Sequence, residues 1–514
     1  MANRLPVLIA IVFFLLVALV SLGVFERITH VEDEAAYWFQ AQVFAQGRLS
    51  VPTPPLAESY WSPFVIDYQG QRFGKYPPGY PLLLSVGMAV GAPWAVNALL
   101  GALALWLVAD LGRKVYSPVT GLLAAALGLT CPVMLATSSS LLSHTTSIFL
   151  AALFLWAFAG VYRSCQASQL SPSGKWAALA GLALGYLAIT RPFDAVGIGF
   201  PFALYSLGQV LSPHRRSWLR PLGIAAAVAI LVGLILPLFW YRVTGQVTLN
   251  PYRFVYPYDR PGFGPDVGVQ GHSLSVALIY LKFNLGALAT GFLGWPGYLN
   301  VVFLVLPFIL QWWVSPRDAE SWRRHHAWNY LLLGSFVSVA GIYMTYWFYG
   351  GHDAGFPRYY LAALPTLLLL TGRGIDLLSL TLRRMGRKIS PGAGQLLPVA
   401  SLYPALVALV IFNGFVFLPP HLSAFRGKYG VTAAPLQVVE DAGITDAIVF
   451  VPDVEHWHQF AVFFAANSPT LDSDVVYAIF YNARQADAVR GLYPDRGCHI
   501  LRKEQLLPCA FDNR

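Results

Sequence analysis

Charged side chains are scarce in this sequence. Asp, Glu, Lys and Arg together make up 11% of its 514 residues, whereas soluble globular proteins carry about 25%. So little charge could not cover the surface of a soluble protein of this size, which excludes a soluble enzyme. Cysteine is scarce too, and the four residues present exclude a small secreted module held together by disulfide bonds.

Apolar and aromatic residues are abundant instead. The apolar types account for 56% of the chain and the aromatic types alone for 14%, which excludes a disordered chain. Runs of about 20 apolar residues recur along most of the sequence, and each could cross a bilayer core of about 30 Å. The sequence therefore predicts a polytopic α-helical membrane protein. Its net charge, 34 − 25 = +9, is typical of cytoplasmic loops rather than of a nucleic-acid-binding surface.

About eleven transmembrane helices are predicted. The uncharged stretch 115–162 is too long for one span and suits a hairpin that turns at Ser138-Ser139-Ser140. We expect residues 80–91 to form a helix that lies at, or dips into, the outer surface without crossing. The expected spans are 5–25, 94–112, two within 115–162, 175–190, 193–211, 221–241, 297–314, 328–348, 358–377 and 397–418.

The distribution of Lys and Arg indicates the orientation of these spans. If 80–91 does not cross, the basic clusters in the short loops after residue 110 all lie on the same side as Arg4, as expected for cytoplasmic loops. If 80–91 crossed, every one of these clusters would lie outside. The sequence therefore predicts a cytoplasmic N-terminus and an extracytoplasmic C-terminus.

Three substantial segments are external in this topology. Two belong to the membrane domain 1–418, namely residues 26–80 and residues 243–296, of which the second is rich in Tyr, Pro and Gly. The third is the tail 419–514. Strand-like and helix-like runs alternate in this tail, which predicts a small extracytoplasmic α/β domain.

The tail has two further features. Cys498 and Cys509 lie on the oxidising side, and whether they form a disulfide is left open. The run Asp453-Val454-Glu455-His456-Trp457-His458 contains alternating His, but a solvated loop explains it more simply than a metal site does. No metal ligand is therefore assigned.

Carboxylates open the first external segment. Asp33 and Glu34 follow the first span directly and begin a short amphipathic helix that Gly47 ends. Acidic residues in a first turn commonly cap the helix and oppose its dipole. A carboxylate at the membrane boundary can equally serve as a general base, because burial tunes its pKa. Position alone leaves both interpretations open.

A lysine stands near the other end of this segment. Lys75 and Tyr76 precede Pro77-Pro78-Gly79 and the expected surface helix, where an ammonium group can meet a lipid phosphate. A surface lysine that extends to water would leave the same pattern. Lys75 is therefore a candidate phosphate-binding residue, and Tyr76 a candidate beside it.

Further polar residues fall at the outer mouths of the expected helices. Each alone could be an ordinary loop residue, but charge near a membrane is costly and is usually functional. Cations that face a carboxylate suit a transfer reaction with an anionic leaving group. The candidate phosphate-binding cations are Lys75, Arg191 and Arg358, and the other site candidates are His144, His352, Asp353 and Tyr359.

The order of these motifs resembles the GT-C fold glycosyltransferases, especially the bacterial aminoarabinose transferases and their protein O-mannosyltransferase relatives. The resemblance rests on Asp33-Glu34 after the first span and on Lys75-Tyr76-Pro77-Pro78-Gly79-Tyr80-Pro81-Leu82-Leu83. It returns at Arg358-Tyr359-Tyr360-Leu361 with Pro365, and in the tail at Asn482 and Tyr493-Pro494-Asp495-Arg496.

Such enzymes take a sugar from a polyprenyl-phosphate donor and pass it to an acceptor at the outer face of the membrane. The resemblance implies a hexosyl- or pentosyltransferase in the inner (plasma) membrane of a bacterium, with a lipid-linked glycan, a lipid or a protein as acceptor. It also implies that Asp33 is the base, that Glu34 is its neighbour and that Lys75 contacts the lipid phosphate. The family often has a carboxylate where this chain has His144, which puts a second acidic group, and metal binding through it, in doubt. A divalent metal is therefore unsupported, and no cofactor is assigned.

A transporter or flippase of lipid-linked sugars is the main alternative, since it would use the same cationic helix mouths. Its ionisable groups should lie near the bilayer midplane, whereas the expected spans are nearly free of charge. A scaffold or receptor that acts through the tail would need no polar cluster at the helix mouths. The sequence therefore favours a transferase, in which Asp33 takes the acceptor proton and one displacement inverts the anomeric carbon.

Overall fold

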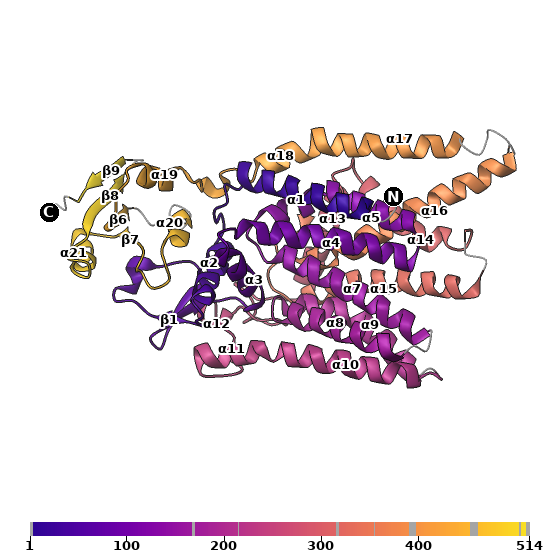
Figure 1. Cartoon of the computed structure of the whole chain (residues 1–514), viewed down its shortest axis with the longest axis horizontal. Helices are drawn as coiled ribbons and strands as arrows, with labels where there is room; N and C mark the ends of the chain where they lie inside the picture. The colour runs from indigo at the N-terminus through magenta and orange to yellow at the C-terminus, as the bar shows by residue number, and fades with distance from the viewer. Residues whose placement is uncertain are drawn as a thin grey trace.

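Helices dominate the structure, a computed structural model that describes residues 4–166, 170–213, 215–314, 318–353, 355–389, 397–452, 461–502 and 505–509. Most of them run roughly side by side along the longest axis of the molecule (Figure 1). A smaller unit of strands and short helices stands at one end of this bundle, near the C-terminus. The bundle comprises α1 (Leu5–Gly23), α4 (Trp94–Val115), α5 (Pro118–Thr130), α6 (Pro132–Ser139), α7 (His144–Gln166), α8 (Leu170–Ala188), α9 (Pro192–Val210), α10 (Arg215–Gly233), α11 (Ile235–Thr244), α13 (Leu274–Gly291), α14 (Leu299–Leu310), α15 (Ala319–Tyr343), α16 (Leu364–Ile389) and α17 (Leu397–Phe412).

Seven helical segments within the described ranges are long and apolar enough to cross a membrane, and the bent pair α5–α6 would make an eighth. The apolar window of the α16 segment is 94% buried, whereas that of α10–α11 is 6% buried. α16 therefore lies at the centre of the bundle, and α10–α11 lie at its edge (Figure 1), where their apolar side chains would face lipid. The length and apolar composition of these helices indicate that the chain is a membrane protein.

Several predicted elements are confirmed as helices. α8 and α9 lie where the spans 175–190 and 193–211 were expected, and α3 (Gly79–Ala89) lies where a surface helix was expected. With 11 residues, α3 is too short to cross a bilayer, which takes about 20. The total of eleven spans stays a prediction.

One apolar helix was missed. α13 lies within 243–296, a segment that the sequence analysis placed wholly outside the membrane, yet its 18 residues are long and apolar enough to cross. The Tyr-, Pro- and Gly-rich first half of that segment obscured the apolar run that follows it. The chain that follows α15 packs against α13 and the residues just before it. The Asn284 side chain donates to the Tyr349 carbonyl at 3.2 Å, and the His272 ring lies 2.9 Å from the Met344 carbonyl.

The expected hairpin in 115–162 is present but bent. α5 and α6 meet at an angle of 61° because Pro132 cannot donate to the ladder and holds the preceding Cys131 in an extended conformation. α6 ends at Ser139, close to the predicted turn, and α7 begins at His144. The α6–α7 turn therefore places His144 beside the first external segment.

The first external segment combines two helices with a small sheet. α2 (Glu32–Ala45) follows α1, and the antiparallel strands β1 (Val51–Pro52), β3 (Gln71–Gly74) and β2 (Val65–Tyr68) lie in that order in the sheet. The 3₁₀ helix η1 (Ala57–Tyr60) lies between β1 and β2.

Gly79 fixes the end of this segment against the bundle. Its N–H donates to the Ile189 carbonyl at 2.8 Å, and a Cβ at this position would lie 2.3 Å from the Thr190 side-chain oxygen. Only glycine permits so close an approach. Lys75 and Tyr76 are thereby held near the α8–α9 turn that carries Arg191.

The tail forms the predicted alternation of strands and helices. β6 (Ala447–Pro452), β7 (Val475–Phe480) and β8 (Gly497–Arg502) are parallel in the order β7-β6-β8, and β9 (Gln505–Pro508) pairs antiparallel with β8. β9 was not expected. The flanking helices are α19 (Ala434–Asp441), α20 (Ala461–Ala466) and α21 (Ala483–Gly491), of which α21 matches the helix expected near 482–492. The His-containing run 453–458 lies outside the described residues.

The structure contains the Cys498–Cys509 disulfide that the sequence left open, which joins β8 to the end of β9. The tail unit also contacts the first external segment. Trp38 on α2 donates to the Ala465 carbonyl at 3.0 Å, and Gln42 donates to the same carbonyl at 3.1 Å. α2 is therefore fixed between the bundle and the tail unit.

Candidate active site

Asp33 is the central carboxylate of the site. It lies in the first turn of α2, where Val31 at the N-cap provides no side-chain hydrogen bond. Its Oδ1 accepts a hydrogen bond from the Tyr76 hydroxyl, and its Oδ2 lies 3.5 Å from the Arg358 guanidinium. The Asp33 side chain remains 23% exposed. These contacts hold the carboxylate from two sides and leave it reachable by a substrate.

Two protonated tyrosine side chains lie beside Asp33. Burial, together with the nearby Asp33 charge, raises the pKa of Tyr76 well above its usual value and also raises the pKa of Tyr37. Both phenols therefore stay protonated at neutral pH. Their rings pack 4.5 Å apart, and the Tyr37 hydroxyl lies 2.9 Å from the Ser143 hydroxyl in the α6–α7 turn. Tyr37 thus connects α2 to the residue before His144.

Glu34 contacts backbone groups instead of the site. Its Oε2 accepts from the His30 N–H at 2.7 Å and its Oε1 from the Leu141 N–H at 2.8 Å. Burial raises the pKa of Glu34 to about 7, although both hydrogen bonds oppose the rise. Glu34 therefore fastens the start of α2 to the α6–α7 turn and orients Asp33 next to it.

Glu34 should make the stability of the protein depend on pH. Its folded pKa of about 7 exceeds the unfolded value of about 4.3, so its contribution is fully present below about pH 4.3 and is lost as pH rises through 7. We expect Glu34→Gln to remove this loss. Thermal unfolding of the purified protein between pH 5 and 8 should show wild-type Tm falling relative to the variant by the equivalent of about 1–3 kcal/mol. Parallel curves would show that Glu34 does not titrate in this range.

Lys75 is enclosed by aromatic rings and paired with a carboxylate. It is 4% exposed, and its Nζ lies 3.3 Å from Asp259 Oδ2. The same ammonium lies 4.2 Å from the ring centre of Phe64, 4.6 Å from that of Tyr252 and 5.2 Å from that of Tyr256. Such rings stabilise a cation in place of water.

Asp259 is a site residue that the sequence analysis missed. Besides Lys75, its carboxylate accepts from the Tyr346 hydroxyl at 2.5 Å and from the Trp347 indole at 3.0 Å. The only signal in the sequence was a carboxylate within a stretch rich in Tyr and Pro. Tyr346 and Trp347 are 87 and 88 residues away from Asp259 in the chain, and Lys75 is farther still. Sequence spacing could therefore not identify these partners.

Arg191 belongs to a second polar network at the α8–α9 turn. Its Nε lies 2.9 Å from Asp194 Oδ2, and its Nη2 donates to the Tyr343 hydroxyl at 3.0 Å. Tyr343 in turn donates to Asp194 Oδ1 at 2.7 Å and stacks on Tyr359 with 4.6 Å between ring centres. Asp194 and Tyr343 were not predicted. Tyr359 was predicted. Its ring centre lies 5.7 Å from the guanidinium carbon of Arg191 and 5.9 Å from that of Arg358.

Arg358 follows a small hairpin. β4 (His352–Asp353) pairs with β5 (Phe356–Pro357), and the Arg358 N–H donates to the Gly351 carbonyl at 3.1 Å. This arrangement places the Arg358 side chain against Asp33. The side chains of His352 and Asp353 lie outside the described part of the structure. His144 is buried at the start of α7, within electrostatic range of Arg191 and Arg358.

The structure therefore brings most predicted residues to one end of the bundle. The three predicted cations each face a different carboxylate: Lys75 faces Asp259, Arg191 faces Asp194, and Arg358 faces Asp33. A cavity of about 430 Å³, counting the open space at its mouth, lies beside Arg358 and Glu34 and is also lined by His30 and Lys428. The arrangement offers a partly exposed carboxylate, protonated phenols and cations that can bind an anion. Within the described ranges, no three His, Cys, Asp or Glu side chains gather so as to hold a metal ion.

No protein-family model and no curated protein matches this chain, but solved structures resemble it. ArnT from Cupriavidus metallidurans bound to undecaprenyl phosphate has 13% sequence identity and a TM-score of 0.57, over 95% of this chain and 88% of that one. The apo form of the same protein has 13% identity and a TM-score of 0.56, over 96% and 92%. An oligosaccharyltransferase from Archaeoglobus fulgidus, tethered with an acceptor peptide, has 15% identity and a TM-score of 0.48, over 93% and 64%.

The likeness to the two ArnT structures establishes the fold. The ArnT structures cover nearly the whole of this chain, and ArnT is a GT-C fold glycosyltransferase. The GT-C fold expected from Asp33-Glu34 and the Lys75 motif is thereby confirmed. At 13% identity the likeness shows the fold alone.

Proposed function

We propose that this chain is a glycosyltransferase that moves a sugar from a polyprenyl-phosphate donor to an acceptor at the outer face of the membrane. One observation carries the proposal: Asp33, 23% exposed, is held by Tyr76 and Arg358, and the buried ammonium of Lys75 lies 5.6 Å from the ring centre of that same Tyr76. A base beside an anion-binding cation is what transfer from a phosphate requires. The GT-C fold and the undecaprenyl phosphate bound to the ArnT structure support the same donor class.

Lys75 is the proposed partner of the donor phosphate. Its ammonium is already desolvated within the ring of Phe64, Tyr252 and Tyr256, so a phosphate oxygen that replaces Asp259 would meet it in a poorly hydrated site, where charge pairs are strong. The guanidinium carbons of Arg191 and Arg358 lie 5.7 and 5.9 Å from the ring centre of Tyr359. Either guanidinium can help to stabilise the negative charge of the leaving phosphate.

The reaction is a single displacement. The acceptor hydroxyl oxygen bonds to the anomeric carbon while its proton passes to an Asp33 oxygen, and the bond between that carbon and the phosphate oxygen breaks. The phosphate keeps the bonding electron pair and leaves as polyprenyl phosphate, so the anomeric configuration inverts. Tyr76, which stays protonated, holds Asp33 in place throughout.

The acceptor has an approach of its own. The cavity beside Arg358 also borders Glu34, the neighbour of Asp33 on α2, and Lys75 is not among its lining residues. We therefore place the acceptor in this cavity and the donor phosphate at Lys75, with Asp33 between them. A lipid-linked glycan, a lipid or a protein would each present a hydroxyl there, and the sugar would be a hexose or a pentose.

The orientation belongs to the same proposal. The Lys/Arg pattern supports a cytoplasmic N-terminus and an extracytoplasmic C-terminus, in the inner (plasma) membrane of a bacterium. The tail unit 419–514 would then be an extracytoplasmic domain on the side of the candidate active site. Its hydrogen bonds from Trp38 and Gln42 on α2 agree with that placement.

Reconstitution in liposomes tests this function. We expect the protein to move label from undecaprenyl-phosphate-linked pentose or hexose into a lipid extract of bacterial envelopes and to release undecaprenyl phosphate. Labelled donor that crosses the bilayer without losing its sugar would indicate the flippase alternative instead. A reporter fused after Arg514 should be external in intact cells, and a cytoplasmic reporter would contradict the orientation.

A further inference from the structure

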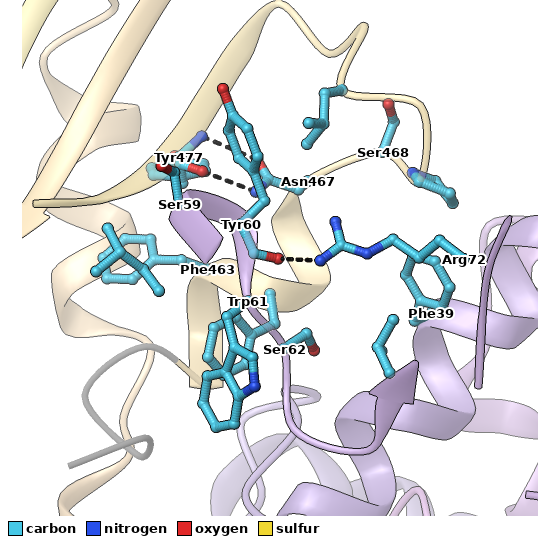
Figure 2. Close-up of a pocket in the computed structure, with 15 residues that line it drawn as sticks. Phe39, Ser59, Tyr60, Trp61, Ser62, Arg72, Phe463, Asn467, Ser468 and Tyr477 are labelled. Atoms are coloured by element: carbon cyan, nitrogen blue, oxygen red, sulfur yellow. Dashed lines mark hydrogen bonds between the residues drawn. The ribbon is translucent and has the colours of Figure 1, made fainter. Parts of the chain in front are cut away.

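A second cavity, of about 440 Å³ counting the space at its mouth, lies between the first external segment and the tail unit (Figure 2). One wall is η1 with the residues that follow it, and the other is α20 with β7. Phe39 on α2 contributes to its lining. Six of its fifteen lining residues are aromatic: Phe39, Tyr60, Trp61, Phe463, Phe464 and Tyr477.

The walls of this cavity are held rigidly. Arg72, which is 4% exposed, donates to the Tyr60 carbonyl at 2.9 Å and pairs with Asp67 at 3.2 Å. On the opposite wall, the Asn467 side chain donates to the Tyr477 carbonyl and accepts from its N–H, both at 2.9 Å (Figure 2). A cavity whose walls are fixed before binding loses little entropy when it takes a ligand.

One wall is also tied to the other. The Gln485 amide at the start of α21 donates to the Ser59 hydroxyl in η1, and the Tyr481 hydroxyl donates to the Glu58 carbonyl at 3.2 Å. The cavity is therefore a feature built jointly by two external units, and not a gap left between units that pack poorly.

Two lining residues point to a ligand. Ser62 is 7% exposed, yet its hydroxyl has no hydrogen-bond partner among the described residues. A buried hydroxyl without a partner is costly and is normally satisfied. Beside it (Figure 2), Trp61 is 44% exposed. The Trp61 ring lies 6.1 Å from that of Phe464, at an angle of 87°.

This combination suits a sugar ring. The C–H face of a pyranose is apolar and stacks on an indole, while the ring hydroxyls need a partner such as Ser62. A saturated chain would leave the Ser62 hydroxyl unsatisfied, and a phosphate would make no use of the aromatic lining. Carbohydrate is therefore the class that uses both the aromatic and the polar lining.

We propose that this cavity binds a sugar residue of a glycan acceptor, at a distance from the reacting hydroxyl. The inference rests on the proposed function. Phe39 follows Asp33 by six residues on α2, which is about 9 Å along the helix axis, or one to two sugar residues. Binding there would hold the acceptor by a part that does not react, and such remote binding can be used to position the reacting group.

The location favours the acceptor over the donor. The cavity is formed by the first external segment and the tail unit, whereas the donor phosphate is placed at Lys75 against the bundle. Trp38 and Gln42 tie the α20 wall to α2, the helix that carries Asp33. An occupied cavity would therefore stabilise the helix that presents the base.

Glycan binding by the full-length protein in detergent tests the proposal. The probe is an array of bacterial polysaccharide fragments that contain hexoses, deoxyhexoses and N-acetylhexosamines. Wild type should bind one group of fragments, and Trp61→Ala and the near-isosteric Ser62→Val should each weaken that binding about tenfold or more. Trp313→Ala is the matched control, because Trp313 is 70% exposed and follows α14 in the bundle, and it should bind like wild type.

Three outcomes would overturn the proposal: no fragment bound by wild type, variants that bind like wild type, or a cavity that takes only an acyl chain. The last would appear as quenching by a brominated detergent that is stronger in wild type than in Trp61→Ala and that glycans do not relieve. Undecaprenyl phosphate binding, measured on the same preparations, should be equal in wild type, Trp61→Ala and Ser62→Val. Glycan binding without lipid binding would contradict the proposed donor and leave this site standing, whereas lipid binding without glycan binding would contradict this site alone.

Discussion

Asp33→Asn should fold, insert and bind the lipid donor, yet transfer sugar about 10²–10⁴-fold more slowly than wild type. The amide keeps the shape of the side chain and still accepts from the Tyr76 hydroxyl. It cannot take the proton of the attacking hydroxyl. The measurement is sugar transfer per folded enzyme, alongside undecaprenyl phosphate affinity.

The control is Asp266→Asn. Asp266 is also a carboxylate paired with an arginine, Arg260 at 3.2 Å, but its side chain is 80% exposed. Exposed pairs contribute little, so this variant should keep wild-type turnover. If Asp33 served only to stabilise the start of α2, its replacement would lower stability by about 1 kcal/mol and leave turnover intact. Near-normal turnover of Asp33→Asn would remove Asp33 as the base and transfer the role to Glu34 or His144.

Local sequence patterns were sufficient for part of this site. Asp33 and Lys75 are adjacent to features that a single sequence displays, a helix start after an apolar span and a Pro-Pro-Gly break. The three parallel strands of the tail were predicted because buried parallel strands form short, continuous apolar runs. Arg191 and Arg358 became candidates because the predicted topology placed their loops on one side of the membrane.

The partners of these residues could not be predicted in the same way. The Lys75–Asp259, Tyr346–Asp259 and Tyr343–Asp194 contacts join segments 87 or more residues apart, and no local period reports such distances. The same applies to Glu34. Its position beside Asp33 suggested chemistry, but its contacts with the His30 and Leu141 N–H groups are visible only after α2 has packed against the α6–α7 turn. α13 was missed because composition was averaged over a segment whose two halves differ.

The Lys75–Asp259 pair allows a sharper test of the donor site than any single substitution. Both side chains are buried, at 5% and 2% exposure, and removing one partner of a buried pair costs about 3–5 kcal/mol, because the other charge stays without compensation. We expect Lys75→Met and Asp259→Asn each to lower Tm. The double variant should recover most of the loss, because it leaves no unpaired charge.

Both single substitutions are expected to lower Tm, but they should have opposite effects on lipid binding. If the donor phosphate replaces Asp259 at the Lys75 ammonium, Asp259→Asn removes a competitor, and undecaprenyl phosphate should bind about tenfold more tightly, equivalent to about 1.4 kcal/mol. It should also restore more Tm to Asp259→Asn than it adds to wild type. Lys75→Met and the double variant should lose this binding, although the double variant is stable. A double variant that binds the lipid like wild type would show that Lys75 and Asp259 form a structural ion pair, and the phosphate site would then have to lie at Arg191 and Arg358.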